Sequence, residues 1–398
     1  MPDTRRTEKL YSGTPGPYWQ DELLARLRCD PRFAQPLQAA TTWAAIPLGR
    51  LVENDRPFPN SNPSSLCYFT SSSTGAPKRV AFSSRDWQQT IVHRADCLAE
   101  LGLGKDHLAT VALPFGPWFS GDNLCESLLQ LGARVLPASL YGPHLPGMAC
   151  LMANVGANAL ITTPSIAHSM TRFPAPGLLD KLILVGEAAS PSIRGRLTNH
   201  FGVVPQCLYA ASEAVLGAEV QDQPGVFHWD PERLYLEVLT PQGSIVEKGI
   251  GELLVTRRYG DAMPLLRYPL NDRVELLPDA KDGPLFRYLG RSGHAFGLAT
   301  GVKVRRAQLE RFLDEIPGLI HAAHFIVEHT PESDRLQIIL GGSGPLPEPA
   351  DVCNRFINSS LDVADAHRCG FLTIAAKLHD APVRAKRQLR ITEAPWNL

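Results

Sequence analysis

Short apolar runs alternate with longer amphipathic stretches from about Leu66 to Phe227. Each apolar run is bounded by turn residues and has the length of a buried strand, so it predicts one strand of a sheet. The predicted strands are LATVALPF (108–115), ARVLPAS (133–139), ALITTP (159–164), KLILVG (181–186) and PQCLYA (205–210). The predicted helices are CESLLQLG (125–132), PGMACLMANVG (146–156) and SIRGRLTNHFG (192–202). This alternation indicates an α/β fold, with a large N-terminal domain of layered parallel sheets and helices.

The pattern changes after Phe227. Residues 233–258 alternate apolar and polar side chains on either side of a Pro-Gln-Gly turn, which predicts a small antiparallel β portion. The elements predicted after it are a helix over 306–316, a β-hairpin over 321–342 and one further helix over 349–362. We therefore expect an N-terminal domain over 1–289 and a small, mobile α+β C-terminal domain over 290–398, hinged near Arg291–Gly293.

Composition narrows the class of protein. The 398 residues are 44% hydrophobic and carry a formal net charge of -1, so they can bury a large core but show no basic excess for nucleic acid or an anionic membrane. We expect no signal peptide, because the charged N-terminal stretch is not followed by an apolar core. We expect no membrane span, because Asn154, Gly156 and Asn158 interrupt the apolar stretch that begins at Gly147. The eight cysteines form no C-x-x-C pair and the twelve histidines show no ligand spacing. This favours reduced core thiols in a cytoplasmic protein and no metal–thiolate site.

The stretch YFTSSSTGAPKRV (68–80) carries the main candidate chemistry. The hydroxyl and backbone N–H groups of Ser71, Ser72, Ser73 and Thr74 can donate hydrogen bonds to an anion, and Gly75 allows close backbone approach. Lys78 adds a mobile positive charge. The stretch can therefore hold a polyphosphate, although it lacks the G-x-x-x-x-G-K-[ST] pattern of a P-loop. A serine-rich surface turn with a solvated lysine is the alternative.

The same stretch resembles YTSGTTGxPKG, the phosphate-binding signature of the adenylate-forming superfamily of acyl-CoA synthetases, adenylation domains and luciferases. Four further segments resemble its signatures in the same order: LVGEAAS (184–190), LYAASEA (208–214), PLLRYPLND (264–272) and GRSGHAFGLATGVKVRRAQLE (290–310). Segments 114–139, 225–244 and 262–278 are similar to the phenylacetate–CoA ligase-like branch. The chain is thus identified as a member of the superfamily, nearest to that branch.

The resemblance implies a reaction. We expect ATP-dependent activation of a carboxylic acid, preferably an aromatic one, to an acyl-adenylate with release of pyrophosphate. Transfer of the acyl group to a thiol would follow, the acceptor being CoA or the phosphopantetheine of a carrier protein. The implied cofactors are ATP and Mg²⁺, with CoA as one candidate, in a cytoplasmic enzyme that uses neither nucleic acid nor a membrane. A homodimer is left open.

The resemblance also implies site residues. Those implied to bind ATP or AMP are Ser71, Ser72, Ser73, Thr74, Gly75, Gly186, Glu187, Ala188, Tyr209, Ala210, Ser212, Asp272 and Arg291. The implied catalytic residues are Lys386, Glu213 and Lys78, and the implied acid pocket contains Phe115, Trp118, Phe119 and Ala211. In this scheme Glu213 holds Mg²⁺, Asp272 accepts the ribose hydroxyls and Tyr209 stacks on adenine. Plain core packing is the alternative for Tyr209 and for the aromatic pair Trp118 and Phe119.

Some positions depart from the family pattern. Ser72-Ser73 replace Gly-Thr, Arg79 and Ala210 replace glycines, and Gly293 stands where the hinge usually has Asp or Lys. The lysine that the family carries near its C-terminus corresponds here to Lys386, to Arg384 or to neither. Two alternatives therefore stay open: an adenylating enzyme with a non-thiol acceptor, and a nucleotide-binding protein that has lost catalysis.

Overall fold

The computed structural model describes most of the chain, and two compact units emerge from its residue contacts. The described residues are 19–29, 37, 43, 46, 65–70, 78–139, 145–171, 173–174, 179–189, 191–260, 262–278, 283–291, 294–298, 303–317, 319–329, 333–343, 346–368, 370–380 and 388–393. One unit comprises residues 1–66, 81–87 and 226–289, and the other comprises 67–80, 88–225 and 290–398. The predicted boundary near residue 290 stays a prediction.

A parallel sheet forms the centre of the second unit. Its strands run in the order β8-β7-β6-β5-β3-β4. The bounds are β3 Leu108–Leu113, β4 Arg134–Ser139, β5 Ala159–Thr162, β6 Lys181–Val185, β7 Gln206–Ala210 and β8 Val215–Glu219. All pairings from β4 to β7 are parallel, and only β8 runs antiparallel to its neighbour β7. The strands lie where the apolar runs predicted them, which confirms the α/β class.

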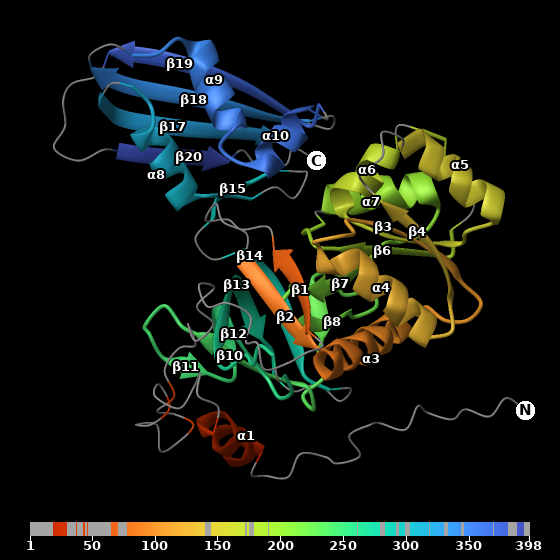
Figure 1. The fold of residues 1–398 in the computed structure, drawn as a ribbon. Coiled ribbons are helices and arrows are strands. Elements are labelled where there is room, and N and C mark those ends of the chain that lie inside the picture. The colour runs from red at the N-terminus through yellow and green to blue at the C-terminus, as the bar shows by residue number, and fades with distance from the viewer. Residues whose placement is uncertain are drawn as a thin grey trace, which may run out of the picture. The chain divides into compact units, whose positions relative to one another are not determined.

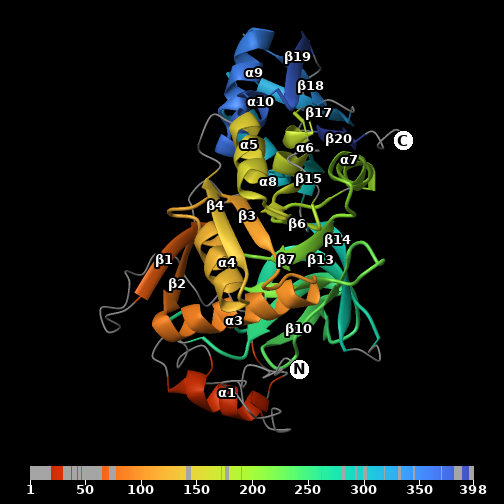
Figure 2. The same ribbon diagram turned by 90° about the vertical axis from the view of Figure 1, so that its right-hand side faces the viewer.

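Helices cover both faces of this sheet (Figures 1 and 2). Their bounds are α3 Ser84–Glu100, α4 Phe119–Gln130, α5 Leu145–Val155, α6 Pro164–Met170 and α7 Pro191–Phe201. On one face Leu98 of α3 and Leu124 of α4 belong to the same buried cluster as Val111, Ile161 and Ile183 of the strands. Helices α5, α6 and α7 lie on the other face (Figure 1). Strands buried from both sides explain the continuous apolar runs of the sequence.

The first unit is mainly antiparallel. Its strands follow the order β11-β10-β12-β13-β14-β9. Their bounds are β9 Val226–His228, β10 Leu234–Leu239, β11 Ile245–Val246, β12 Gly249–Arg257, β13 Tyr268–Leu276 and β14 Leu285–Arg291. The last two residues of β14, Gly290 and Arg291, belong to the second unit. Helix α1 (Trp19–Arg28) packs through three leucines into a cluster with Ile46 and Leu266. The ring of Trp19 also meets those of Trp43 and Tyr235 edge to face. The predicted β portion is therefore confirmed.

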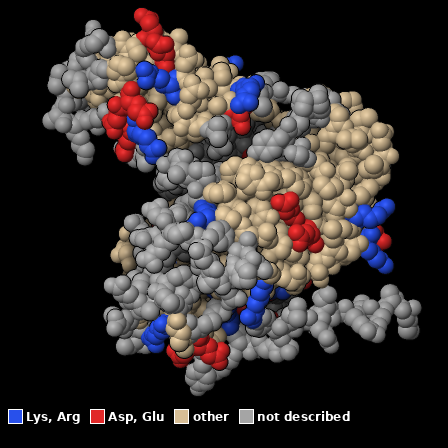
Figure 3. All heavy atoms as spheres, viewed as in Figure 1, with Lys and Arg blue, Asp and Glu red and all other residues tan. Residues whose placement is uncertain are grey.

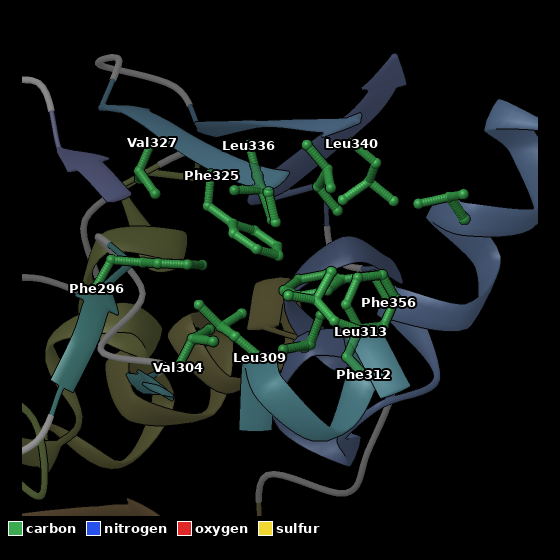
Figure 4. Close-up of a cluster of buried hydrophobic side chains, with 14 of the residues drawn as sticks. Phe296, Val304, Leu309, Phe312, Leu313, Phe325, Val327, Leu336, Leu340 and Phe356 are labelled. Atoms are coloured by element: carbon green, nitrogen blue, oxygen red, sulfur yellow. The ribbon is translucent and has the colours of Figure 1, made fainter. Parts of the chain in front are cut away.

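Residues 294–393 contain a further core (Figure 4). The elements are β15 His294–Gly297, β16 Lys303–Arg305, α8 Arg306–Asp314, β17 Leu319–His329, β18 Asp334–Ser343, α9 Pro349–Ile357, α10 Leu361–Arg368, β19 Leu372–Asp380 and β20 Gln388–Glu393. Four strands form a mixed sheet in the order β19-β18-β17-β20. Side chains of α8, α9 and α10 pack with β17 and β18 around Phe325 and Phe356, both 0% exposed. The predicted helix and hairpin here are confirmed.

The sequence was wrong about one helix. We predicted a single helix over 349–362, but the chain forms α9 and α10 with a break at Asn358–Ser360. The hydroxyl of Ser360 accepts a hydrogen bond from the N–H of Val363 at 3.1 Å, so Ser360 caps α10. The first helix ends at Ile357 with Asn358 as its C-cap. Serine competes with helical hydrogen bonds in mid-helix but is favoured at an N-cap, so Ser360 suits the start of a second helix.

The expectation that most cysteines are core thiols is only partly confirmed. The described cysteines are free thiols, and Cys97 and Cys207 are buried. Cys29 and Cys150 are exposed, and the remaining described ones are half-buried. Helical periodicity does not by itself tell which face of a helix is covered, and Cys150 on α5 lies on an exposed one.

Candidate functional site

The carboxyl ends of four parallel strands bring several predicted site segments to one edge of the sheet. The register pairs Ile161 with Ile183 and Val185 with Leu208, so β5, β6 and β7 end side by side. Gly186 leaves β6 there, and Tyr209 lies one residue beyond Leu208 on β7. The loop with Phe115 leaves β3, the neighbour of β5, at the same edge. Ligands of layered α/β proteins bind outside this edge, so its position fits a binding site.

Gly186 begins the segment that is implied to line the adenine. Its φ is +85°, a conformation that side chains other than glycine rarely adopt. A Cβ built on Gly186 would have no heavy atom within 4 Å, so open space lies beside this backbone. Glu187 is half-buried, and Ala188 is exposed. The segment therefore offers bare backbone next to open space, which a flat base requires.

Glu213 lies in the tight turn that joins β7 and β8. The turn is closed by two hydrogen bonds: the N–H of Ala211 donates to the carbonyl of Ala214 at 2.9 Å, and the reverse bond measures 3.2 Å. Ser212 and Glu213 occupy the turn positions between them. Glu213 is 9% exposed, and Tyr209 and Ala210 are half-buried. The turn thus presents one carboxylate at the edge of the sheet, close along the chain to the predicted adenine contact.

A buried ion pair connects the β7–β8 hairpin to helix α7. Arg194 of α7 donates two hydrogen bonds to the carboxylate of Glu219 on β8, at 2.6 and 3.0 Å. The same carboxylate accepts the backbone N–H groups of Cys207 at 2.9 Å and Gly225 at 2.7 Å. Burial, and then the charge of Glu219, raises the pKa of the Cys207 thiol to about 12, against the opposing effect of Arg194. The network ties both strands of the hairpin to α7.

We did not predict Arg194 and Glu219 as site-supporting residues. The arginines of the predicted helix stretch SIRGRL and the glutamate of the apolar stretch LGAEV were the only signal. Because a buried charge is costly without a partner, each of these residues could have been expected to have a partner of opposite sign. Their spacing of 25 residues gave no indication that they meet.

The predicted acid-pocket segment forms the start of α4. Phe119 is 2% exposed, its ring lies 4.6 Å below the guanidinium carbon of Arg94, and the ring of Tyr68 meets it edge to face at 6.1 Å. Trp118 and Phe115 are half-buried. The burial of Phe119 favours the packing alternative for that residue, whereas Trp118 and Phe115 retain surface that a ligand could contact.

Strand β1 (Ser65–Thr70) ties the phosphate-loop segment to this region. The N–H of Phe69 donates to the carbonyl of Pro117 at 2.8 Å, and Phe69 pairs with Trp118 in a parallel bridge. The hydroxyl of Tyr68 donates to Asp122 at 3.4 Å. Burial, and then Asp122, raises the pKa of Tyr68 to about 12. Strand β1 therefore runs beside the segment that contains Pro117 and Trp118 of the predicted acid pocket.

Several predicted site residues lie outside the described residues. These are Ser71, Ser72, Ser73, Thr74, Gly75, Gly293, Arg384 and Lys386. Lys78 begins β2 (Lys78–Ser83) and Arg291 ends β14, but only their backbone is described. Their roles stay predictions.

Asp272 belongs to the other unit and lies at a bulge of β13. The register with β12 pairs Glu252 with Arg273 and Leu254 with Pro269, so extra residues on β13 bulge between these pairs. Asn271 adopts a φ of 57°, in the left-handed region that asparagine tolerates better than most residues. Asp272 is 4% exposed, and its charge, after burial, raises the pKa of Glu252. Bulges re-aim side chains next to functional sites, which fits a binding role for Asp272.

The described residues contain neither a cluster of metal ligands nor a helix that could span a membrane. No group of three His, Cys, Asp or Glu side chains among them is arranged as a metal site. A magnesium ion bound with a nucleotide needs one or two carboxylates and uses phosphate oxygens for the rest, so Glu213 alone fits that demand. Within the same residues, every helix is too short or too polar to cross a membrane.

These features define a layered α/β protein in which several predicted site segments lie at the carboxyl edge of the parallel sheet. Comparison with known proteins identifies the family: the AMP-binding enzyme model matches residues 20–255. This chain therefore belongs to the AMP-binding enzyme family. That family assignment confirms the resemblance found in the sequence.

Individual relatives are more distant. The chain is 24% identical to a phenylacetate–coenzyme A ligase of Aromatoleum evansii over 275 residues, which are 65% of this chain and 61% of the relative. It is 26% identical to that of Escherichia coli (strain K12) over 282 residues, or 65% and 62% of the two chains. The matches thus span about six tenths of the length of these curated relatives.

Solved structures share the fold. A 2-hydroxyisobutyryl-CoA ligase in complex with 2-HIB-AMP and CoA superposes with a TM-score of 0.68 at 16% identity, covering 96% of this chain and 91% of the other. An amide bond synthetase from Marinactinospora thermotolerans gives 0.58 at 17% identity, covering 80% and 66%. At such identities the likeness establishes the architecture alone.

Proposed function

We propose that this protein is an acyl-adenylate-forming ligase, which activates a carboxylic acid with ATP and passes the acyl group to a thiol. The observation that carries the proposal is the turn between β7 and β8, which presents Glu213 at the sheet edge where Gly186 opens onto free space. Family membership and the relatives named phenylacetate–coenzyme A ligase support the same reaction.

In the first step, a carboxylate oxygen of the acid attacks the α-phosphorus of ATP. A new P–O bond forms and the bond to pyrophosphate breaks, so two anions must be brought together and the leaving group stabilised. The hydroxyls of Ser71–Thr74 and Lys78 would hold the outer phosphates. Glu213 would hold Mg²⁺, which supplies the charge that neutralises them. Lys386 would contact the acid and the α-phosphate.

The nucleoside would occupy the sheet edge. Gly186, Glu187 and Ala188 would line the adenine, and the half-buried ring of Tyr209 would stack on it, flanked by Ala210 and Ser212. Asp272, an acceptor when ionised, would bind the ribose hydroxyls, with Arg291 as a second contact. The acid would lie between Phe115, Trp118 and Ala211, whose flat and small apolar surfaces suit an aromatic acid.

Acceptor, assembly and location are further parts of the proposal. The neighbouring ligase structure contains CoA, which supports a thiol acceptor. An amine acceptor is the second candidate, and the amide bond synthetase among the structural neighbours favours it. We place the enzyme in the cytoplasm and leave open a homodimer and a carrier-protein acceptor.

The test is acid-dependent exchange between ATP and labelled pyrophosphate over a panel of aryl and aliphatic acids. We expect exchange with Mg²⁺ present, strongest with aryl acids. Glu213→Gln should lower exchange by roughly 10²-fold, the typical effect of removing one electrostatic group from a reaction centre. Glu315→Gln, which makes the same change at an exposed carboxylate, should leave it unaltered. Absence of exchange with every acid would overturn the proposal.

A further inference from the structure

The mixed sheet β19-β18-β17-β20 has one covered face and one open face. Side chains of α8, α9 and α10 pack on the first face with Phe325, Val327, Leu336 and Ile338. In Figures 1 and 2, α9 and α10 lie on one side of β17, β18 and β19. Side chains alternate along a strand, so the residues between the core positions point to the other side. We call that side the open face.

The register aligns the residues of the open face in rows across the four strands. One row contains Lys377, Ile339, His324 and Arg390, and the next contains Ala375, Gln337, Ile326 and Thr392. The isoleucines, His324 and Gln337 are half-buried by their neighbours. Lys377, Ala375, Arg390 and Thr392 on the two edge strands are exposed. The centre of the face therefore combines two isoleucines with the polar His324 and Gln337, and its margins carry the cations Lys377 and Arg390.

The charges on the open face have one predominant sign. Its exposed cations are Lys377, Arg390 and Arg335, its histidines are His324 and His379, and its one described carboxylate is Glu328. Glu328 lies 3.9 Å from Arg335 and offsets that charge. Lys377 and Arg390 make no ion pair with any described side chain. The imidazole of His324 lies 2.8 Å from the hydroxyl of Thr392, and burial and then Arg390 lower its pKa.

The helical side of the same segment has the opposite balance. Its exposed carboxylates are Glu310, Asp314, Glu315, Glu348, Asp351 and Asp365, and its exposed arginines are Arg311, Arg355 and Arg368. Figure 3 shows acidic and basic groups next to each other on the described part of this side. Among the described side chains, this segment is therefore acidic on its helical side and basic on its open face, although the whole chain is near neutral.

We propose that the open face is the docking surface of an acidic protein that carries the acceptor thiol, a phosphopantetheine carrier. The inference rests on the proposed function, which requires a thiol acceptor and leaves its carrier open. An acidic partner fits the basic margins, and its apolar side chains can contact Ile326 and Ile339 at the centre. Charge complementarity of this kind speeds association and selects the partner.

The size of the open face matches a protein that binds briefly. β20 contains six residues, and six residues of each of the other three strands are in register with them. At strand spacings of about 4.8 Å and a rise of about 3.3 Å per residue, this area spans roughly 400 Å². This lies in the range of weak, transient interfaces, which bury less than about 600 Å² on each partner. A carrier must leave after each transfer, so a small charged interface is suitable. A lone phosphate group of CoA would use only one or two of these side chains.

The experiment compares charge reversals on the two sides of the segment. The double variant Lys377→Glu with Arg390→Glu alters the open face, and Arg355→Glu with Arg368→Glu is the matched control on the helical side. Three rates are measured for each: ATP–pyrophosphate exchange, acyl transfer to CoA, and acyl transfer to an acidic holo acyl carrier protein and an acidic holo peptidyl carrier protein. Binding of the same labelled carriers is measured directly by fluorescence anisotropy.

We expect the open-face variant to lose about tenfold or more in kcat/KM for a carrier at low salt, since reversing charges acts mainly on association. Exchange and transfer to CoA should change less than twofold, and the control should behave as wild type. Equal losses in both variants, or no loss in either, would overturn the proposal. So would wild-type protein that binds neither carrier, a parallel loss with CoA, or an altered oligomeric state in the open-face variant only. If the wild-type protein shows no ATP–pyrophosphate exchange, the proposed function is refuted. Direct binding of the carriers would still decide whether the open face is a docking surface.

Discussion

Gly121, in the first turn of α4, should not tolerate a side chain although it lies in a helix. A Cβ at this position would lie 2.7 Å from the carbonyl oxygen of Pro114 and 2.8 Å from two ring atoms of Phe115. The N–H of Gly121 also donates to that carbonyl at 3.1 Å, so the loop after β3 is held close to the helix. A methyl group there must displace backbone, not only a flexible side chain.

The magnitude follows from two opposing effects. Replacing glycine by alanine inside a helix stabilises a protein by about 0.5–1 kcal/mol through backbone entropy. Forcing a methyl group into a packed site costs about 1–3 kcal/mol. Gly195 of α7 provides the matched control, because a Cβ there would meet nothing within 4 Å. Gly195→Ala should therefore raise the unfolding temperature. The free energy of unfolding of Gly121→Ala should be about 1–3 kcal/mol lower than that of Gly195→Ala.

Both variants are unfolded thermally and in urea, and ATP–pyrophosphate exchange is measured at varied acid and ATP concentrations. If the loop of Pro114 and Phe115 lines the acid pocket, Gly121→Ala should raise the KM for the acid more than the KM for ATP. Equal unfolding temperatures for the two alanine variants would refute the steric argument. Equal effects on both KM values would separate the loop from the acid pocket.

Three further predictions concern stability and thiol reactivity. Glu219→Gln should destabilise the protein by about 3 kcal/mol in urea unfolding, because Arg194 then keeps a buried charge without its partner. The double variant Glu219→Leu with Arg194→Leu should recover much of that loss. A double variant that is no more stable than the single variant would contradict this. Alkylation at pH 8 followed by mass spectrometry should label the exposed Cys29 and Cys150 first and leave Cys207 unlabelled, since burial raises the pKa of its thiol from 9.0 to about 12 and keeps it protonated. Because the pKa of the Cys207 thiol is raised, labelling of Cys207 should stay absent until the pH approaches 12 or the protein unfolds. Labelling of Cys207 at pH 8 would exclude the buried arrangement of Cys207 with the Arg194–Glu219 ion pair. Ser360→Ala should cost about 1 kcal/mol through loss of the cap on α10, while Ser360→Asp should retain most of the stability; identical melting of all three proteins would show that the cap contributes nothing.

The sequence alone determined the elements whose signal is local. Apolar runs of strand length gave β3 to β7 at the expected places, because a strand covered on both faces must be apolar throughout its length. The signature segments were located at strand ends for the same reason: a loop with small and polar residues must follow where a buried strand stops. Gly186 directly follows β6 and Glu213 follows β7, the two strands that the apolar runs 181–186 and 205–210 predicted.

Tertiary structure alone decided the contacts between distant segments. Arg194 and Glu219 are paired by the order of strands, and Phe69 reaches Pro117 because β1 runs beside the loop after β3. The bulge with Asn271 depends on the register between β12 and β13, and local propensity does not contain that register. The prediction missed the break before α10 for a different reason, because apolar periodicity continues across Ser359 and Ser360. Likewise, the basic open face exists only because four strands align residues that lie up to 68 positions apart in the chain. Pairing across such separations is selected by the free energy of the whole packed sheet, and a window along the sequence does not report it.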